Sequence, residues 1–228
     1  MNTSAALYYS IRSPYSYLGI MRLQQLLPNQ PRPVDIEVKP VMPIAVRRPE
    51  VFRKLNPLAI PYLELDTRRA AEQYGIDFRV WPVPDPIVQN METLEIAEQQ
   101  PHIYRLTRLM QYAAEVGKGY DFTLQLATLL WNGKTDNWNS DDHLAAAAAD
   151  AGLSFVDMQS AIDADPQHYD DAIAANQTAL AAAGHWGVPT IVFNGEPFFG
   201  HDRIETFLWR AGWLCPVVRR QLVAGRNQ

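Results

Sequence analysis

The sequence is poor in the residues that define several common protein classes. Its 228 residues include a single cysteine, Cys215, which excludes an intrachain disulfide framework and a thiolate metal cluster. Lysine and arginine total 20 against 25 aspartate and glutamate, which gives a formal net charge of -5. A protein that neutralises the phosphates of a duplex needs clustered basic residues in excess, so we expect no nucleic-acid partner.

Long apolar runs and cofactor-binding glycine loops are also lacking. No run approaches the ~18 to 20 residues that cross a bilayer, and the N-terminus has no basic segment followed by an apolar stretch. We therefore expect no membrane partner and a soluble, cytoplasmic protein. No glycine-rich loop of the dinucleotide-binding or P-loop type is present. The five histidines show no metal-ligand spacing, so no metal site is expected.

The opening of the chain has the pattern of a strand, a helix and a second strand. Residues 5–11 are mostly apolar, aromatic or β-branched, which is typical of a buried strand. Ser13 and Pro14 then give a serine N-cap and a proline at the first helical position, followed by apolar positions three and four apart. Residues 34–38 alternate apolar and charged side chains, which predicts a half-exposed strand. A right-handed crossover would make the two strands parallel.

The middle of the chain is predicted to be almost entirely helical. Nearly every segment from about residue 57 to residue 184 has helical periodicity. The prolines of residues 81–86 force an extended loop, after which we expect the helices to resume. Ser140 precedes one helical segment as an N-cap, and Ser154 precedes another with an acid three residues on, the spacing of a capping box.

Strand signals return near the C-terminus. Residues 188–193 are rich in β-branched side chains, Asn194-Gly195 is a strong two-residue hairpin turn, and residues 197–199 follow as the second strand. Asp202 then stands where it can cap a final helix.

The resulting order, βαβ, helical block and ββα, predicts the fold class. It is the arrangement of the α/β thioredoxin-like fold, here with an inserted α-helical domain as in DsbA-like proteins. We expect residues 1–56 and 185–228 to form the thioredoxin-like domain and residues 57–184 to form the all-helical insertion. Because such a fold hosts many activities, the function has to be inferred from the motifs.

Three short motifs could carry chemistry. Ser13-Pro14-Tyr15-Ser16 has the spacing of a redox C-P-x-C motif, but hydroxyls replace both sulfurs. Because disulfide exchange needs an attacking thiolate and a resolving thiol, the site would have to handle another molecule's sulfur. The second motif, Gly187-Val188-Pro189-Thr190, enters a strand. The third, Gly200-His201-Asp202-Arg203, offers backbone N–H groups and a carboxylate at a helix start.

These motifs and their flanking residues resemble the 2-hydroxychromene-2-carboxylate isomerases and the related kappa-class glutathione transferases. The resemblance covers nearly the whole chain, from residues 8–18 through Asn56-Pro57 to residues 199–203. These relatives are DsbA-like members of the thioredoxin superfamily in which serine replaces the first active-site cysteine. The resemblance implies a glutathione-dependent cis-trans isomerase of aromatic catabolism, with glutathione as the cofactor and a homodimeric assembly.

The resemblance also implies a role for each residue of the glutathione site. Ser13 would donate a hydrogen bond to the glutathione sulfur, and the helix dipole would favour the thiolate. Pro189 would be cis, and the Val188 backbone would pair with the cysteinyl part of glutathione. Asp202 and the amides around His201 would hold the γ-glutamyl ammonium and carboxylate.

The second substrate implied by the resemblance is an aromatic, carboxylated small molecule. Thiolate addition to an activated double bond, rotation about the resulting single bond and departure of the thiol would isomerise it. Asn56 matches an asparagine that contacts glutathione or substrate in these relatives. The side chains that could hold the ring and the carboxylate are Arg12, Tyr15, Arg47 and Trp81.

Other interpretations of the same residues stay open. A kappa-like transferase would keep the same glutathione residues and change the substrate loop. A non-catalytic DsbA-like module would hold a peptide or protein partner on the strand beside Pro189. Ser13 and Asp202 could also serve only as helix N-caps, which is a common use of serine and aspartate.

Overall fold

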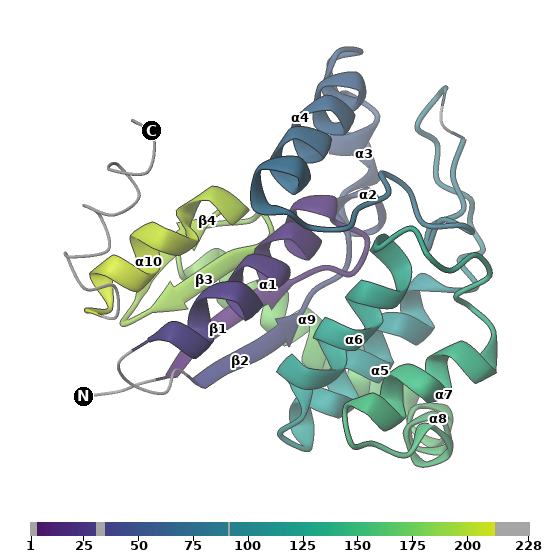
Figure 1. Cartoon of the computed structure of the whole chain (residues 1–228). Coiled ribbons are helices and arrows are strands. Elements are labelled where there is room, and N and C mark those ends of the chain that lie inside the picture. The colour runs from purple at the N-terminus through teal and green to yellow at the C-terminus, as the bar shows by residue number, and fades with distance from the viewer. Residues whose placement is uncertain (1–3, 31–34, 91, 213–228) are drawn as a thin grey trace.

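The protein is built around a mixed sheet. In the computed structural model, which describes residues 4–30, 35–90 and 92–212, four strands pair in the order β2-β1-β3-β4 (Figure 1). β1 pairs in parallel with β2, and β3 pairs in antiparallel with both β1 and β4. The strands are β1 (Ser4–Tyr9), β2 (Asp35–Pro40), β3 (Thr190–Phe193) and β4 (Glu196–Phe199). The predicted parallel βαβ unit and the C-terminal hairpin are confirmed.

Residues of β1 alternate between two apolar clusters, as the period of a strand requires. Leu7 and Tyr9 belong to the main core, which also contains residues of α1 (Pro14–Leu26) and α10 (Ile204–Arg210). Tyr8, between them, packs instead with Val41 and Leu180, and Leu180 lies on α9 (Pro166–Ala182). The sheet is therefore covered on both faces, which agrees with the nearly continuous apolar character of β1.

Short local signals set the two turns that matter for the site. Ser13 has extended backbone angles, φ -91° and ψ 116°, and its side chain accepts a hydrogen bond from the Ser16 N–H. Pro14 follows at the first helical position, so α1 starts where predicted. In the hairpin, Asn194 and Gly195 have φ values of 51° and 80°, the positive angles that a tight two-residue turn needs.

Helices make up most of the chain between β2 and β3. They are α2 (Ile44–Arg47), α3 (Pro49–Phe52), α4 (Ala59–Tyr74), α5 (Ile103–Glu115), α6 (Gly119–Trp131), α7 (Asp141–Asp150) and α8 (Phe155–Ala164), together with α9. Two 3-10 turns in the described ranges lie outside this block: η1 (Leu27–Asn29) and η2 (His201–Arg203). Among the described residues, none of the helices is both long enough and apolar enough to span a membrane.

Helices resume after the proline-rich loop as predicted, but only at Ile103, so the prediction that nearly every segment of residues 57–184 is helical is wrong for residues 76–102. The described residues between Gly75 and His102 form no helix. The Gln100 side chain accepts from the Val88 N–H at 2.9 Å and donates to the Val88 carbonyl at 2.8 Å. Such side-chain bonds satisfy backbone groups that a helix would otherwise pair, so helical periodicity in this segment does not produce a helix.

The expected N-cap role of Asp202 is also wrong. Asp202 lies inside η2, and α10 begins at Ile204 with Arg203 in the N-cap position. The Asp202 carboxylate instead accepts from the adjacent Arg203 guanidinium at 2.9 Å. The capping interaction predicted for Ser154 is confirmed, because its Oγ accepts from the backbone three residues on at 3.3 Å. Ser140 stands at the N-cap of α7 without a side-chain capping bond.

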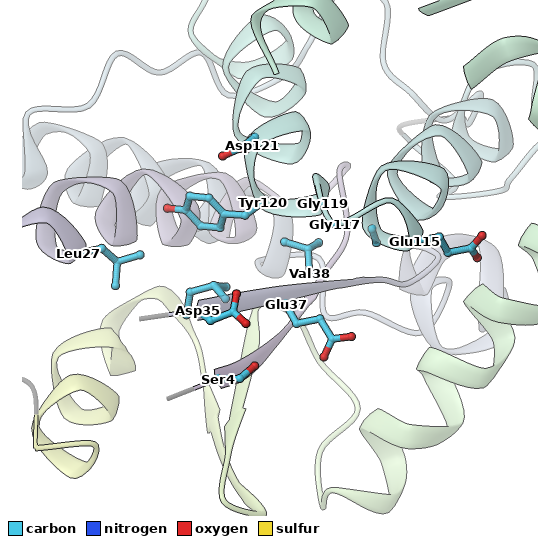
Figure 2. A pocket seen from close by; sticks show the side chains of 12 residues that line it. Ser4, Leu27, Asp35, Glu37, Val38, Glu115, Gly117, Gly119, Tyr120 and Asp121 are labelled. Atoms are coloured by element: carbon cyan, nitrogen blue, oxygen red, sulfur yellow. The ribbon is translucent and has the colours of Figure 1, made fainter. Parts of the chain in front are cut away.

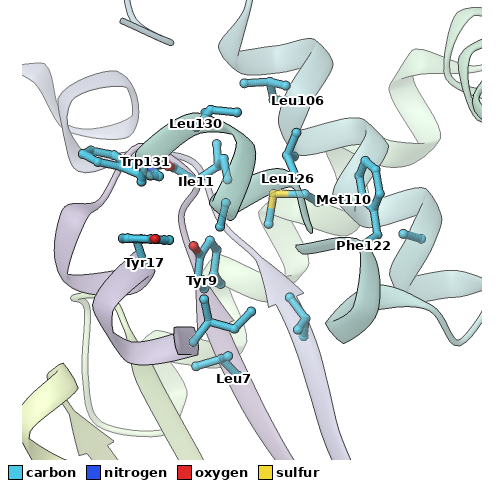
Figure 3. Packing of buried hydrophobic residues seen from close by; sticks show 14 of the residues in the cluster. Leu7, Tyr9, Ile11, Tyr17, Leu106, Met110, Phe122, Leu126, Leu130 and Trp131 are labelled. Carbon is cyan, nitrogen blue, oxygen red and sulfur yellow. Dashed lines mark hydrogen bonds between the residues drawn. The ribbon is translucent and has the colours of Figure 1, made fainter. Parts of the chain in front are cut away.

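One apolar cluster joins the sheet to the helical block (Figure 3). Tyr9 of β1, Tyr17 of α1 and Trp131 of α6 are all at most 1% exposed. The Trp131 Nε1 donates to the carbonyl of Ile11 at 2.8 Å, which fixes the end of α6 to the turn after β1. This core contains residues of both predicted domains. The division into a thioredoxin-like domain (residues 1–56 and 185–228) and a helical insertion (residues 57–184) therefore stays a prediction.

Candidate active site

The first motif forms the turn between β1 and α1, and it presents one serine to a cavity. Ser13 donates its N–H to the Ser10 carbonyl at 3.1 Å, and its Oγ accepts from the Ser16 N–H at 3.2 Å. The capping bond uses an oxygen lone pair and leaves the hydroxyl hydrogen as a donor. Ser16 is fully buried and does not line the cavity that Ser13 lines. Ser13 can therefore cap α1 and donate its hydroxyl hydrogen to a ligand at the same time.

The second motif lies against the first helix. The Val188–Pro189 peptide bond is cis, as the resemblance implied. Pro189 approaches α1 so closely that a Cβ on Gly19 would lie 3.2 Å from the proline ring. Neither backbone polar group of Val188 is hydrogen-bonded within the described part of the chain. This leaves the Val188 N–H and carbonyl available to an extended ligand.

The Ser13 cavity, with a volume of about 160 Å³, unites five of the predicted site residues. Arg12, Ser13, Tyr15, Arg47 and Val188 all line it. Its other lining residues are Ser10, Pro14, Pro43, Ile44, Ala45, Leu63, Trp186, Gly187 and Phe199. The Oγ of Ser10 is buried and has no hydrogen-bond partner among the described residues.

The His201 cavity, with a volume of about 570 Å³, adjoins the first and shares Tyr15, Val188 and Phe199 with it. It contains the predicted residues His201 and Asp202. Its remaining lining residues are Gly200 and, on α4, Asp66, Arg69, Ala70, Gln73 and Tyr74. A site built on the two cavities would thus be framed by the thioredoxin-like elements and by one helix from the middle of the chain.

Tyr15 forms the wall that the two cavities share. Its hydroxyl donates to Asp66 at 2.8 Å, and its ring stacks on His201 with centroids 5.2 Å apart and an interplanar angle of 6°. Burial, followed by the hydrogen bond to Asp66, raises the pKa of Tyr15, which keeps the phenol neutral. Burial lowers the pKa of His201, whose Nδ1 lies 3.3 Å from the Tyr74 hydroxyl. Near neutral pH both rings are therefore uncharged.

Comparison with known proteins identifies the family. The model of the DsbA-like thioredoxin domain matches residues 6–210. The chain belongs to the DsbA-like thioredoxin family. No match was found among curated proteins.

Solved structures show the same DsbA-like fold at low sequence identity. A 2-hydroxychromene-2-carboxylate isomerase has a TM-score of 0.61 and 19% identity, over 97% of this chain and 98% of the isomerase chain. A probable DsbA oxidoreductase from Streptomyces coelicolor has a TM-score of 0.61 and 18% identity, over 93% of this chain and 92% of the oxidoreductase chain. The cytosolic disulfide reductase DsbM from Pseudomonas aeruginosa, in a structure with GSH, has a TM-score of 0.52 and 13% identity, over 85% and 87%.

Three predicted residues of this DsbA-like chain, Pro189, Asn56 and Trp81, line neither cavity. Asn56 is exposed, and its Oδ1 accepts from the Leu58 N–H at 2.9 Å just before α4. Trp81 donates its Nε1 to Glu64 at 2.8 Å and packs against the Arg12 guanidinium, 4.6 Å from the ring centroid. Trp81 therefore supports Arg12 instead of lining a cavity.

The α4 residues of the His201 cavity were missed by sequence reasoning. Asp66, Arg69 and Gln73 are spaced three and four apart, so the helical period places them on one face. That period is visible in the sequence, but nothing local indicates that this face meets His201. Only the packing of α4 beside α1 brings the two together (Figure 1).

A third cavity of the DsbA-like fold lies elsewhere, at the edge strand β2. Figure 2 shows its lining, which includes the acidic side chains of Asp35, Glu37, Glu115 and Asp121. It has a volume of about 520 Å³ and contains no residue of the three motifs. Within the described ranges, no group of three or more His, Cys, Asp or Glu is arranged to hold a metal ion. Cys215 lies outside the described residues.

Proposed function

We propose that this DsbA-like protein is a glutathione-dependent isomerase that acts on an aromatic, carboxylated small molecule. The observation that carries the proposal is the position of the Ser13 hydroxyl, at the start of α1 and in one cavity with the Val188 backbone. A serine at this place can bind a thiolate but cannot form a disulfide. The site therefore suits a reaction that uses a small thiol without oxidising it.

The residues present fit glutathione. The unpaired Val188 backbone suits the cysteinyl unit of a peptide, and the buried Ser10 hydroxyl offers a further polar contact. The His201 cavity carries charges of both signs: Asp66 and Asp202 would face the γ-glutamyl ammonium, and Arg69 would face the carboxylate. Its volume of about 570 Å³ lies within the usual range for small ligands.

Ser13 would set the ionisation of the bound sulfur. Its hydroxyl would donate to the sulfur, and the partial positive charge at the start of α1 would favour the thiolate over the thiol. A free thiol has a pKa near ~8.5, so a fall of one or two units makes a large fraction ionised at neutral pH.

When bound, glutathione would supply a thiolate that forms a C–S bond to the conjugated double bond, shifts the π pair to the carbonyl oxygen, and leaves again after rotation. The Ser13 cavity would hold the substrate beside the sulfur, with its apolar walls around the ring and an arginine on the carboxylate. No electron is gained or lost overall, which agrees with a site that has no cysteine.

The proposal is also supported by what two solved structures of the same fold are described to be. One is the 2-hydroxychromene-2-carboxylate isomerase, and the other is the DsbM reductase determined with GSH. The proposal includes a cytoplasmic location, which would keep glutathione reduced. It also includes a homodimeric assembly. A kappa-like glutathione transferase would use the same thiolate and retain the C–S bond.

One observation favours a second candidate, a non-catalytic peptide-binding module. The free backbone groups of Val188 could pair with an extended peptide other than glutathione. Peptide binding that glutathione does not displace would support this candidate.

The test compares two N-cap serines. Ser13→Ala and Ser154→Ala each remove a hydroxyl that accepts one helix N–H, at 3.2 and 3.3 Å, so each should cost about 1 kcal/mol of stability. We expect saturating glutathione to raise the Tm of the wild type and of Ser154→Ala by about 5 to 10 °C. The rise should be much smaller for Ser13→Ala, and smaller for the wild type with a glutathione analogue that lacks the thiol. Equal shifts in all three proteins would contradict a sulfur contact at Ser13.

A further inference from the structure

The Ser13 cavity contains two arginines, and one of them is already neutralised. Arg12 donates from Nε and Nη2 to the two carboxylate oxygens of Asp85, at 3.2 and 2.8 Å. The side chains of this pair are 8% and 23% exposed. A bidentate pair of this kind compensates the charge and fixes the guanidinium, so Arg12 has little left to offer an anion.

Arg47 is in the opposite situation. Its Nη2 donates to the Trp186 backbone carbonyl, while its Nε is buried and has no hydrogen-bond partner among the described residues. No carboxylate of the described chain lies within 4.0 Å of its guanidinium. Burial, and then the charge of the neighbouring Arg48, lowers the pKa of Arg47. A ligand carboxylate would relieve both the unmet hydrogen bond and the uncompensated charge.

The rest of the cavity limits what such an anion can carry. Its apolar lining comes largely from Pro14, Pro43, Ile44, Leu63 and Phe199. The volume is about 160 Å³, and an apolar cavity of about 150 Å³ in another protein accommodates one benzene molecule. This volume matches one aromatic ring more closely than the two fused rings of the chromene named for the structurally similar isomerase.

We propose that the Ser13 cavity binds the carboxylate of a ligand that carries a single aromatic ring, and that Arg47 rather than Arg12 selects the carboxylate. This deepens the proposed function and rests on it for the sulfur that would react. Binding of the anion itself is independent of glutathione and can be measured separately.

The test is calorimetric titration of the full chain with benzoate, benzamide and 2-naphthoate, with glutathione titrated in parallel. We expect benzoate to bind at least ~10-fold more tightly than benzamide, because the amide loses a charge-assisted bond, and more tightly than the two-ring 2-naphthoate. Arg47→Met should abolish the preference for benzoate over benzamide, and Arg47→Lys should retain part of it. Arg53→Met is the matched control, because Arg53 is exposed and lines neither cavity, and it should behave as the wild type.

Several outcomes would overturn the inference: no benzoate binding at millimolar concentration, equal affinity for benzoate and benzamide, or tighter binding of 2-naphthoate. It would also be overturned if Arg47→Met left benzoate binding intact and weakened glutathione, since Arg47 would then serve a glutathione carboxylate. If benzoate binds as expected while glutathione does not bind at all, the proposed function fails and the anion site stands.

Discussion

Tyr15 and His201 show how single side chains set the chemistry of the site. Their rings stack between the two cavities, and the Tyr15 hydroxyl is held by Asp66. Burial raises the pKa of the phenol and lowers that of the imidazole, so both stay neutral near neutral pH. Two uncharged rings can pack face to face without the cost of burying a charge.

The lowered pKa of His201 predicts a loss of stability in mild acid. The ordinary value is 6.5, so in this window the unfolded chain binds more protons than the folded chain. Stability should be complete above about pH 6.5 and fall as the pH drops toward the lower folded pKa. We expect His201→Gln to show a smaller fall in Tm than the wild type between about pH 7.5 and about pH 5.5.

His143→Gln, at a half-buried histidine that lines neither cavity, is the control for this pH series, and it should follow the wild type. If His201→Gln lost as much stability in acid as the wild type, His201 would not be the group responsible.

At the scale of an element, the segment leading into β3 is held from both sides. The Gly187 N–H donates to His185 Nδ1 at 2.9 Å, and the Gly187 carbonyl accepts from the Thr190 hydroxyl at 2.8 Å. The His185 ring also stacks on Phe199, with centroids 4.1 Å apart. A Cβ on Gly187 would lie 2.6 Å from the Phe199 ring, so any larger residue there would displace that ring. These contacts fix the backbone just before Val188.

Two substitutions of His185 separate its hydrogen bond from its stacking. His185→Asn keeps a side-chain acceptor for the Gly187 N–H. His185→Phe keeps the stacking on Phe199 but leaves the Gly187 N–H unpaired. We therefore expect His185→Phe to weaken glutathione binding by roughly 10-fold and His185→Asn to bind nearly as the wild type does. Calorimetric titration with glutathione measures both. Stronger binding by the Phe variant than by the Asn variant would assign the role to stacking instead.

At the scale of the whole molecule, the helical block and the sheet share one core. Trp131 of α6 reaches the Ile11 carbonyl and lies against Tyr17 of α1, with ring centroids 6.4 Å apart. The site depends on this arrangement, because α1 carries Ser13 at its start, α2 carries Arg47 and the middle of the chain supplies α4. We expect the described parts to unfold together.

Trp131→Phe tests this coupling. It removes the only donor that the structure describes for the buried Ile11 carbonyl and leaves a small void, which together should cost about 2 to 4 kcal/mol. Urea unfolding should show one transition, shifted to lower urea. Trp209→Phe, at a side chain that is 63% exposed, should change stability by less than about 0.5 kcal/mol. Two separate transitions in Trp131→Phe would mean that the parts unfold independently.

Sequence prediction was correct where the signal is short-range. Ser13-Pro14 starts α1, and Asn194-Gly195 turns the hairpin, because each is decided by the residue's own dihedral angles and one local hydrogen bond. Prediction was wrong at residues 87–102 and at Asp202, where side chains found partners other than the expected ones. Those partners depend on geometry that a pattern of residue types does not contain.

The sequence by itself determined the order of the strands and main helices, the replacement of both motif sulfurs by hydroxyls, and the three motifs that point to one site. Only the tertiary structure decided that α4 closes that site, that Asn56 and Trp81 lie outside its cavities, and that Arg12 is neutralised while Arg47 is not. The physical reason is the sequence separation over which each kind of interaction acts. Periodicity and capping act over a few neighbouring residues, whereas the pairing of Arg12 with Asp85 spans 73 positions and forms only when the chain packs.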